Sequence, residues 1–369
     1  MLYVHIPYCH RKCTYCAFYS AVTAADKQQY VDALCRELEW RRGEMAHPLR
    51  TVYLGGGTPT ILTAEQLRQI VDAIKANYDV SQVEEATIEA NPEDLTAEFL
   101  EALVGIGFFN RVSIGVQSFR DEDLRLLNRR HSAKQSREAV ARVFEAGIDN
   151  ISIDLIYGLP GQDLTAWRAN LAAAATLPVS HLSAYALTVE PGTMLQRQIE
   201  AGRVVPADEE AVVAHYQELL AWAKEQGFEQ YEISNFARQG CRSRHNSRYW
   251  DRTPYLGVGA AAHSFDGHAR RWNVADERQY VAGIRQGEVP FERETLTEAD
   301  AFNEYVMTAL RTCEGIAKAS VPPAYTVRLA CDIRRYVAAG LIQETATHYC
   351  PTAEGLLHAD GIASELFAE

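Results

Sequence analysis

The sequence is short of basic residues, of long apolar runs and of cysteines that could form a disulfide framework. Its 36 basic and 49 acidic side chains leave a formal net charge of −13 over 369 residues. An extended nucleic-acid surface needs positive charge facing the phosphates, so we expect no nucleic-acid partner. The least charged stretch, residues 169–189, is interrupted by Asn170, Pro178 and His181 and predicts no membrane span.

The amino-terminal residues lack the features of a secretory signal. The chain starts MLYVHIP, with neither a basic segment nor a long apolar core. Eight cysteines in a chain of this length are too few for a fold held together by disulfides. With 47% hydrophobic and 23% charged residues, the composition is that of an ordinary globular protein. We therefore expect a cytoplasmic protein with at most peripheral membrane contact.

The first part of the chain alternates strand-like and helix-like segments, a pattern typical of parallel α/β sheets and barrels. Two of the predicted helices begin with capping boxes, Thr63 with Gln66 and Ser132 with Gln135. Successive β/α units with right-handed crossovers predict a partial (β/α)6 TIM-like barrel, with its chemistry at the carboxyl ends of the strands. The predicted strands are residues 2–6, 51–54, 84–89, 111–117, 150–156 and 181–187.

The composition changes after this barrel. Residues 231–275 are rich in aromatic, Arg, His and Gly residues, and the pattern beyond residue 297 predicts helices followed by a short hairpin, as in a winged helix. We predict a core at residues 1–230, a connecting region at 231–295 and a small, mostly helical, winged-helix-like domain at 296–369.

Cys9, Cys13 and Cys16 follow the first predicted strand with the spacing C-x3-C-x2-C. Thiolates are soft ligands that suit iron–sulfur clusters and zinc. Four-iron clusters usually have four cysteines, so three thiolates would leave one iron open to a non-protein ligand. A zinc site completed by His5 or His10, and three unrelated free thiols, are the alternatives. We favour the cluster, because none of the other cysteines forms a C-x2-C pair.

Several further motifs extend this pattern along nearly the whole chain. They are YVHIPYC at 3–9, GGGTPT at 55–60, IEANP at 88–92, SIGVQSF at 113–119 and IDLIYGLP at 153–160. With the cysteine triplet they resemble the radical S-adenosylmethionine (SAM) superfamily, and within it the group related to oxygen-independent coproporphyrinogen III oxidase. The resemblance implies a [4Fe–4S] cluster on the three cysteines and a SAM molecule that chelates the fourth iron. An electron from the cluster would cleave the sulfonium to give methionine and a 5′-deoxyadenosyl radical.

The resemblance also implies which residues contact SAM. The backbone of the glycine-rich segment would meet the amino group, a carboxylate would accept from the ribose hydroxyls, and an arginine would bind a carboxylate. A salt bridge or a cap at the barrel rim is the alternative role for each polar side chain. The implied SAM contacts are Tyr3, Tyr15, Gly56, Gly57, Thr58, Glu89, Gln117, Arg129, Asp154 and Ala186.

Two features depart from the oxidases and match the haem chaperone branch of the group. Where the oxidases have a further cysteine this chain has Phe18, and only eight residues precede Cys9. The element H-N-x-x-Y-W at 245–250 also resembles that branch and makes His245, Tyr249 and Trp250 a candidate haem region. Histidine is a common haem ligand, and flat aromatic rings can pack against a macrocycle. Cys241 or His263 as the ligand, or a purely structural role for the element, are the alternatives.

The sequence therefore predicts a haem chaperone that binds haem as cargo and delivers it to acceptor haemoproteins. The cluster and SAM would tune transfer or the formation of a homodimer, and no catalytic residue is predicted. The alternative is a radical SAM oxidoreductase that acts on a tetrapyrrole. A nucleic-acid modifier, which the winged-helix-like region could suggest, is disfavoured by the net charge.

Overall fold

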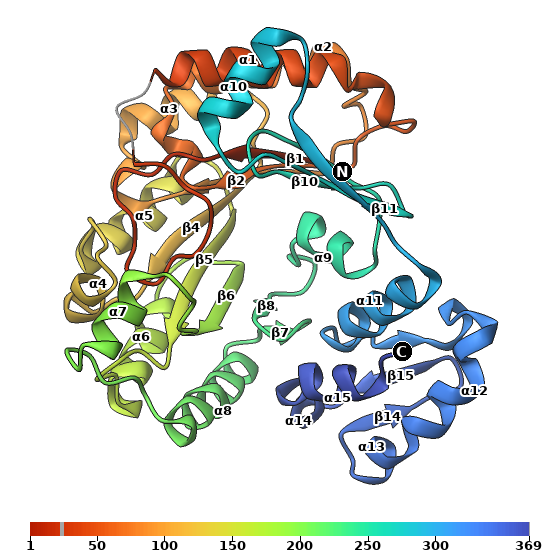
Figure 1. Cartoon of the computed structure of the whole chain (residues 1–369). Helices are drawn as coiled ribbons and strands as arrows, with labels where there is room; N and C mark the ends of the chain where they lie inside the picture. Colours follow the sequence, from red (N-terminus) through yellow and green to blue (C-terminus); the bar gives the residue numbers. More distant parts are fainter. Residues whose placement is uncertain (23–25, 369) are drawn as a thin grey trace.

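The computed structural model describes residues 1–22 and 26–368. Six strands lie side by side in sequence order and run parallel in its main sheet (Figure 1). They are β1 (Leu2–Ile6), β2 (Thr51–Gly56), β3 (Glu85–Ala90), β4 (Arg111–Gln117), β5 (Asn150–Tyr157) and β6 (His181–Ala186). All the predicted strands are confirmed, with ends that differ by no more than two residues.

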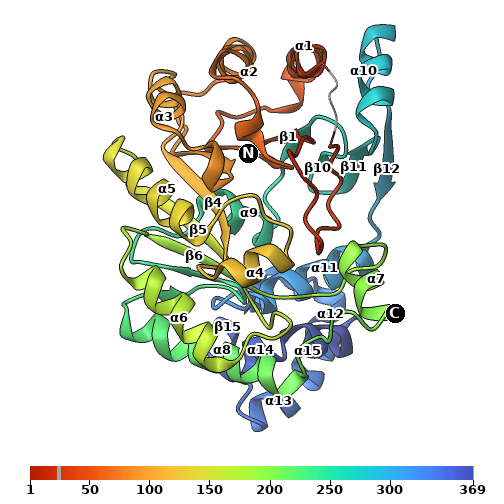
Figure 2. The same ribbon diagram turned by 90° about the vertical axis from the view of Figure 1, so that its left-hand side faces the viewer.

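Helices connect these strands and cover the outer, convex side of the sheet (Figures 1 and 2). Both predicted capping boxes are present: the Thr63 hydroxyl accepts from the Gln66 N–H while the Gln66 side chain accepts from the Thr63 N–H, and Ser132 and Gln135 repeat this exchange. The helices are α1 (Lys27–Trp40), α2 (Ala64–Asn77), α3 (Ala97–Val104), α4 (Asp121–Leu126), α5 (Ala133–Glu145) and α6 (Leu164–Ala175), with short 3-10 turns at Arg42–Glu44, Pro59–Ile61 and Pro92–Asp94.

The two faces of the strands differ in polarity, because alternate residues of a strand face opposite sides of the sheet. On β4, Val112, Ile114 and Val116 are fully buried in the main hydrophobic core, which the helices cover. The residues that alternate with them line the concave side, and there the strands are polar. Tyr3, His5, Tyr53, Thr87, Glu89, Arg111, Ser113, Asp154, His181 and Ser183 belong to this concave face.

Within the described residues the main sheet does not close into a barrel, and further strands extend it on both sides of the six parallel strands. Beyond β6 it continues with the antiparallel strands β8 (Asn235–Ala237) and β7 (Glu229–Gln230). Beyond β1 it continues with β9 (Leu256–Val258), which pairs parallel to β1. The predicted partial barrel is confirmed as an open parallel α/β sheet, and β9 is an addition that the sequence did not reveal.

The chain after the barrel adds helices and a second, antiparallel sheet. The helices are α7 (Met194–Glu200), α8 (Glu209–Glu225), α9 (Arg244–Trp250) and α10 (Glu277–Gln286). The sheet consists of β10 (His263–Phe265), β11 (Ala269–Asn273) and β12 (Phe291–Thr295). Helix α9 lies on the concave side of the main sheet (Figure 1).

The carboxyl-terminal region has a hydrophobic core of its own, built from residues between Phe302 and Ala368. It contains α11 (Glu298–Leu310), α12 (Pro323–Asp332), α13 (Arg334–Ala338), α14 (Ala353–Leu357), α15 (Ala359–Leu366), a 3-10 turn at Lys318–Ser320 and the sheet β13 (Ile316–Ala317), β15 (His348–Pro351), β14 (Ile342–Glu344). The region is mostly helical with a small sheet, as predicted. The domain boundaries themselves stay predictions. None of the described helices is both long and apolar enough to cross a bilayer.

Candidate cofactor site

The three cysteines lie in the loop that follows β1. At one end the loop folds back on itself, because the Cys9 N–H donates to the Ala21 carbonyl at 3.1 Å and the Ala21 N–H to the Pro7 carbonyl at 2.6 Å. In its middle, Thr14 is fixed against the end of α4: its N–H donates to the Leu127 carbonyl at 3.2 Å. All three thiols are partly buried. The loop thus holds them at the carboxyl end of the sheet.

The electrostatics of the thiols indicate that they lie near one another. Burial raises the pKa of both Cys9 and Cys16, and the neighbouring Cys13 raises each further. Among the described residues, no three His, Cys, Asp or Glu side chains form a tight group around a single ion. A four-iron cluster makes a different demand, because each thiolate binds a separate iron.

The zinc alternative is not supported by this geometry. It needs His5 or His10 as a fourth ligand, but no group of three His, Cys, Asp or Glu side chains among the described residues could hold a single metal ion. The His5 Nδ1 pairs with the Tyr3 hydroxyl at 3.1 Å, and the His10 Nε2 lies 3.2 Å from Asp94. The triplet therefore remains a three-thiolate set.

Gly56 and Gly57 lie beside the cysteine loop at the end of β2. Gly56 has a φ of +112°, and its N–H donates to the Glu89 carboxylate at 3.0 Å. A Cβ added to Gly56 would lie 2.5 Å from the His5 ring, and one added to Gly57 would lie 2.6 Å from the Tyr8 carbonyl. Only glycine allows this backbone conformation and close approach without strain.

Arg129 links the cysteine loop to the ends of β3 and β4. Its guanidinium donates to the Cys13 sulfur at 3.3 Å, to the Gly115 carbonyl at 2.7 Å and to the side chain of Asn91. Gln117 lies beside it: a Cβ added to Gly115 would come within 2.9 Å of the Gln117 amide nitrogen and 3.2 Å of the Arg129 guanidinium. Gln117 has a positive φ of 66° and lies at a register shift between β4 and β5. Such irregularities change the direction of a side chain and are common beside functional sites.

Asn91 continues this chain of contacts to a second thiol. Its amide donates to the Thr58 hydroxyl at 3.0 Å, and that hydroxyl lies 3.7 Å from the Cys9 sulfur. Two of the three thiols are thus joined through side chains that follow β2, β3 and β4. Residues that follow the carboxyl ends of these strands therefore hold the cysteine loop in position.

Two carboxyl groups, Glu89 and Asp154, lie on the concave face with unusual acidities. Burial raises the pKa of Glu89 to about 7 and the pKa of Asp154 to about 6. Glu89 accepts from the Tyr53 hydroxyl at 2.7 Å. The fully buried Arg111 lowers both pKa values, and its Nε and Nη1 have no hydrogen-bond partner within the described ranges.

Of the remaining predicted SAM contacts, Tyr3 lies on the concave face, whereas Ala186 packs against the main hydrophobic core. The Tyr3 ring stacks on Tyr53 with centroids 6.0 Å apart. Tyr15 packs against a small apolar cluster that includes Ile156, and Ala186 ends β6 opposite Tyr157. Apart from Tyr3, which is the second residue of β1, the predicted SAM contacts and the cysteines lie in or beyond the carboxyl half of the parallel strands.

The candidate haem region adjoins this site at the amino end of β2 and β3, where the His245 ring centre lies 5.0 Å from that of Tyr53. The Glu85 carboxylate accepts from the N–H groups of Arg244 and His245 at 2.8 and 2.9 Å and so caps α9. His245 is fully buried, with its Nδ1 2.9 Å from the Thr51 hydroxyl and its Nε2 3.1 Å from the Tyr249 hydroxyl. Burial lowers the pKa of His245 to about 3.

These contacts agree with the structural alternative for the element. Both His245 nitrogens have protein partners, so iron ligation would require the Tyr249 hydroxyl or Thr51 to move. Trp250 faces the carboxyl-terminal region, where the Arg311 guanidinium lies 5.5 Å from its ring centre. His263 is exposed and stacks on Trp272 at 6.0 Å, and Cys241 is partly buried.

Sequence reasoning missed Arg111, Asn91 and Tyr53 as members of the site and considered His5 only as a zinc ligand. Asn91 lies within a motif that was already singled out, directly after Glu89 and Ala90. Arg111 is a lone charge that begins a strongly apolar strand, a signal that was visible in the alternation. The His5 Nε2 is buried without a partner in the described chain.

Comparisons with known proteins agree with this architecture. A model of the radical SAM superfamily matches residues 3–171. The heme chaperone HemW of Bacillus subtilis (strain 168) is 36% identical over 321 residues, which cover 86% of this chain and 84% of that protein. HemW of Mycobacterium tuberculosis (strain CDC 1551 / Oshkosh) is 32% identical over 371 residues, 99% of this chain and 94% of that protein. The structure of coproporphyrinogen III oxidase (HemN) from Escherichia coli matches with a TM-score of 0.86 and 26% identity, covering 100% of this chain and 89% of that chain.

The parallel sheet, the cysteine loop and the matched model define the class as the radical SAM superfamily. Within that class, the chain belongs to the HemW family.

Membership implies a [4Fe–4S] cluster and SAM, and the residues present fit both groups. One loop supplies three thiols, which leaves a coordination position for a non-protein ligand. Beside it, close packing excludes any side chain at Gly56 and Gly57. Polar contacts are offered by two buried carboxyl groups and by a His5 nitrogen that has no partner among residues 1–22 and 26–368.

Proposed function

We propose that this protein binds haem and delivers it to acceptor haemoproteins. The observation that carries the proposal is the similarity, over 84–94% of their length, to relatives named heme chaperone HemW. Phe18 supports it, because it stands where the oxidases have a further cysteine. This side chain is 74% exposed in the cluster loop.

We further propose the roles that the sequence predicts for the site residues. Cys9, Cys13 and Cys16 hold the [4Fe–4S] cluster, and the residues gathered around the strand ends, from Tyr3 to Ala186, contact SAM. When bound, the cluster supplies one-electron chemistry at the sulfonium. The protein's part is to orient SAM and to keep the thiolates in place through Arg129.

The function is tested by haemin titration after anaerobic reconstitution of the cluster. We expect a stable complex with a shifted Soret band, and transfer of its haem to an apo-haemoprotein such as apomyoglobin. A protein that forms no such complex would remove the chaperone function. Haemin pre-bound to serum albumin serves as the control for passive transfer.

The oxidase alternative is tested in parallel with coproporphyrinogen III under reducing, anaerobic conditions. The fold match to HemN makes this control necessary. We expect neither decarboxylated product nor substrate-dependent consumption of SAM. Formation of product would establish the oxidoreductase instead.

We also propose that the protein acts in the cytoplasm, as a homodimer, with at most peripheral membrane contact. Sedimentation equilibrium with and without haemin tests the homodimer. A monomer under both conditions would contradict it.

A further inference from the structure

A cavity of about 420 Å³ lies at the opposite end of β1 from the cysteine loop. Its walls come from the segment after α1, from the start of β9 and from the second sheet. Residues of the walls include Met45, Tyr255, Phe265, Arg271, Phe291 and Arg293. Small-molecule sites commonly have this size and this mixture of aromatic and charged groups.

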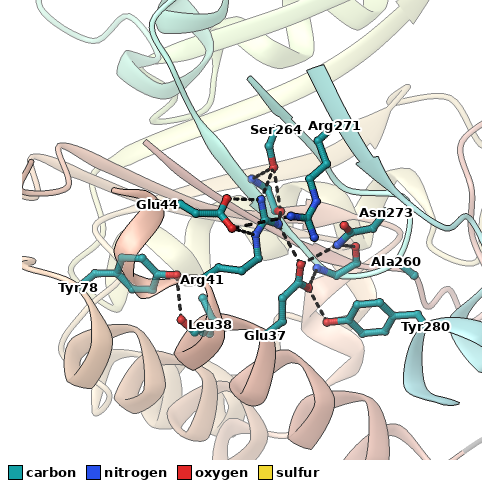
Figure 3. Close-up of polar contacts among 12 residues, drawn as sticks. Glu37, Leu38, Arg41, Glu44, Tyr78, Ala260, Ser264, Arg271, Asn273 and Tyr280 are labelled. Carbon is teal, nitrogen blue, oxygen red and sulfur yellow. Dashed lines mark hydrogen bonds and ion pairs between the residues drawn. The ribbon is translucent and has the colours of Figure 1, made fainter. Parts of the chain in front are cut away.

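The floor of the cavity is a buried ion-pair network that needs no ligand (Figure 3). Arg41 donates to Glu37 at 2.9 Å, to Glu44 at 2.8 and 2.9 Å, and to the Gly257 carbonyl at 2.7 Å. Glu37 also accepts from Tyr280 at 2.6 Å and from Asn273 at 2.8 Å. Since the Ser264 hydroxyl also accepts from Arg41 at 3.1 Å, all the guanidinium N–H groups of Arg41 have acceptors and none is left for a guest.

Arg271 is less well paired than Arg41, and its neighbour Arg293 has one carboxylate partner, Asp266 at 3.3 Å. Arg271 and Arg293 lie directly opposite each other on β11 and β12, where like charges destabilise a sheet. The Arg271 Nε is buried and has no hydrogen-bond partner among residues 1–22 and 26–368, and its nearest carboxylate, Glu44, is 3.8 Å away. Burial and the nearby Arg41 lower the pKa of Arg271. An anion between the two guanidinium groups would relieve this repulsion.

Aromatic and thioether groups supply the rest of the wall. The Phe291 side chain is 50% exposed, and the Arg271 guanidinium lies 3.8 Å from the centre of its ring. Tyr255 and Met45 are partly buried at the same cavity. Flat apolar surface beside two cations suits an aromatic guest that carries carboxylates.

The H-N-x-x-Y-W element lies directly behind this wall. The Tyr249 ring packs edge-on against Tyr255 with centroids 4.8 Å apart, and the Tyr249 hydroxyl pairs with His245. The element therefore positions an aromatic side chain of the cavity, although its own histidine is buried.

We propose that this cavity binds a flat aromatic molecule with carboxylate groups, and that Arg271 and Arg293 bind the carboxylates. The identity of this molecule rests on the proposed function: it is haem, bound through its porphyrin ring and its propionates. His245 and Tyr249 are positioning residues that support the Tyr255 wall.

The test compares haemin with iron-free protoporphyrin IX, which has the same ring and carboxylates but cannot depend on an iron ligand. We expect the Arg271→Gln/Arg293→Gln double variant to bind both probes about tenfold or more weakly. Arg270→Gln is the matched control, because the neighbouring side chain faces the other side of β11 and pairs with Glu304 at 2.9 Å. The single variant Arg293→Gln is also measured. Because this side chain is 58% exposed, its replacement should not disturb folding, so weaker binding by this variant is not explained by misfolding.

The outcomes separate this inference from the proposed function. If the wild type binds haemin and the double variant binds it equally well, the cavity is not the site while the chaperone function stands. If the wild type binds protoporphyrin IX through the two arginines but takes up no haemin, the cavity stands and the chaperone function fails. If His245→Ala abolishes haemin binding while the double variant does not change it, the buried histidine is the ligand and the inference is overturned.

Discussion

The strand side chains on the two faces of the parallel sheet differ in how completely their polar atoms are satisfied. On the convex face, side chains such as Ile114, Ile151 and Ile153 are wholly buried in one hydrophobic core. On the concave face, buried polar atoms lack partners within the described chain, among them the Arg111 Nε and Nη1 and the His5 Nε2. An unpaired buried polar atom costs about 1–3 kcal/mol. The convex face therefore stabilises the fold, whereas the concave face reduces stability in favour of binding.

The two ends of the strands differ in how many contacts hold the segments packed against them. At the carboxyl ends, one side-chain contact joins Cys13 to Arg129 and one joins Cys9 to Thr58, and Asn91 links Arg129 to Thr58. At the amino ends, Glu85 caps α9 through several donors and closes the interior. The open end is where a cofactor can enter, and the closed end is where the fold is anchored.

The largest effect is expected from the loss of one thiol at the open end. Cys13→Ala should abolish cluster incorporation, because two thiolates on one loop cannot hold the four-iron core. Iron content and visible absorption after anaerobic reconstitution measure this. Cys331→Ala, at an exposed cysteine, should retain a full cluster. A complete cluster in Cys13→Ala would show that the open end holds no such site.

The second test sets neighbouring residues of β5 against each other. Ile153→Ala removes a fully buried convex side chain and should lower the free energy of unfolding by about 2–5 kcal/mol. Asp154→Asn replaces a buried carboxyl group on the concave face and should not lower stability at pH 7.5, while SAM binding weakens. Urea unfolding followed by tryptophan fluorescence checks both variants. Equal destabilisation would contradict the division of the two faces.

The third test concerns Arg129, which joins the cysteine loop to the strand ends. Arg129→Gln should weaken SAM binding about 10- to 100-fold, because a charge-assisted hydrogen bond contributes about 1.5–3 kcal/mol. Calorimetric titration of the reconstituted protein with SAM measures this. The exposed Arg125→Gln on α4 is the control. Unchanged affinity in Arg129→Gln would leave Arg129 with a purely structural role.

The part of the fold that could be predicted is the part encoded locally. Capping pairs such as Thr63 and Gln66, and the alternation of Val112, Ile114 and Val116, lie within a few residues of each other, so sequence alone predicts them. The cysteine spacing is local in the same way. Motif order then extends the prediction to the residues of the strand ends.

The rest depends on contacts between distant segments. Strand β9 has only three residues and pairs with β1 more than 250 residues away in the chain, so no periodicity predicts it. The burial of His245 follows from its partner Thr51 on β2, which the H-N-x-x-Y-W pattern does not contain. For the same reason the pairing of Arg271 opposite Arg293 appears only once β11 and β12 are aligned.

The smallest effect is expected from pH, where the histidines and carboxyl groups of the concave face act in opposite directions. Burial holds the pKa of His5 at about 4 and that of His245 at about 3, so below pH 6.5 these groups take up protons only in the unfolded state. Their contribution to stability is therefore lost as the pH falls, by about 1 kcal/mol per histidine per pH unit. Glu89 opposes this loss, because its folded pKa of about 7 lies above its ordinary value of 4.5 and the folded state binds the proton first.

Replacing Glu89 should therefore sharpen the response of the concave face to acid. Between pH 7.5 and 5.5, the wild type loses stability through the histidines and regains part of it as Glu89 becomes protonated. Glu89→Gln cannot take up that proton, so its free energy of unfolding should fall more steeply, by about 2 kcal/mol over this range. Urea unfolding at three pH values measures the slope, with Glu101→Gln, at an exposed position of α3, as the control. A slope in Glu89→Gln equal to that of the wild type would mean that the carboxyl group of Glu89 is hydrated rather than buried, and the concave face would then be no less satisfied than the convex one.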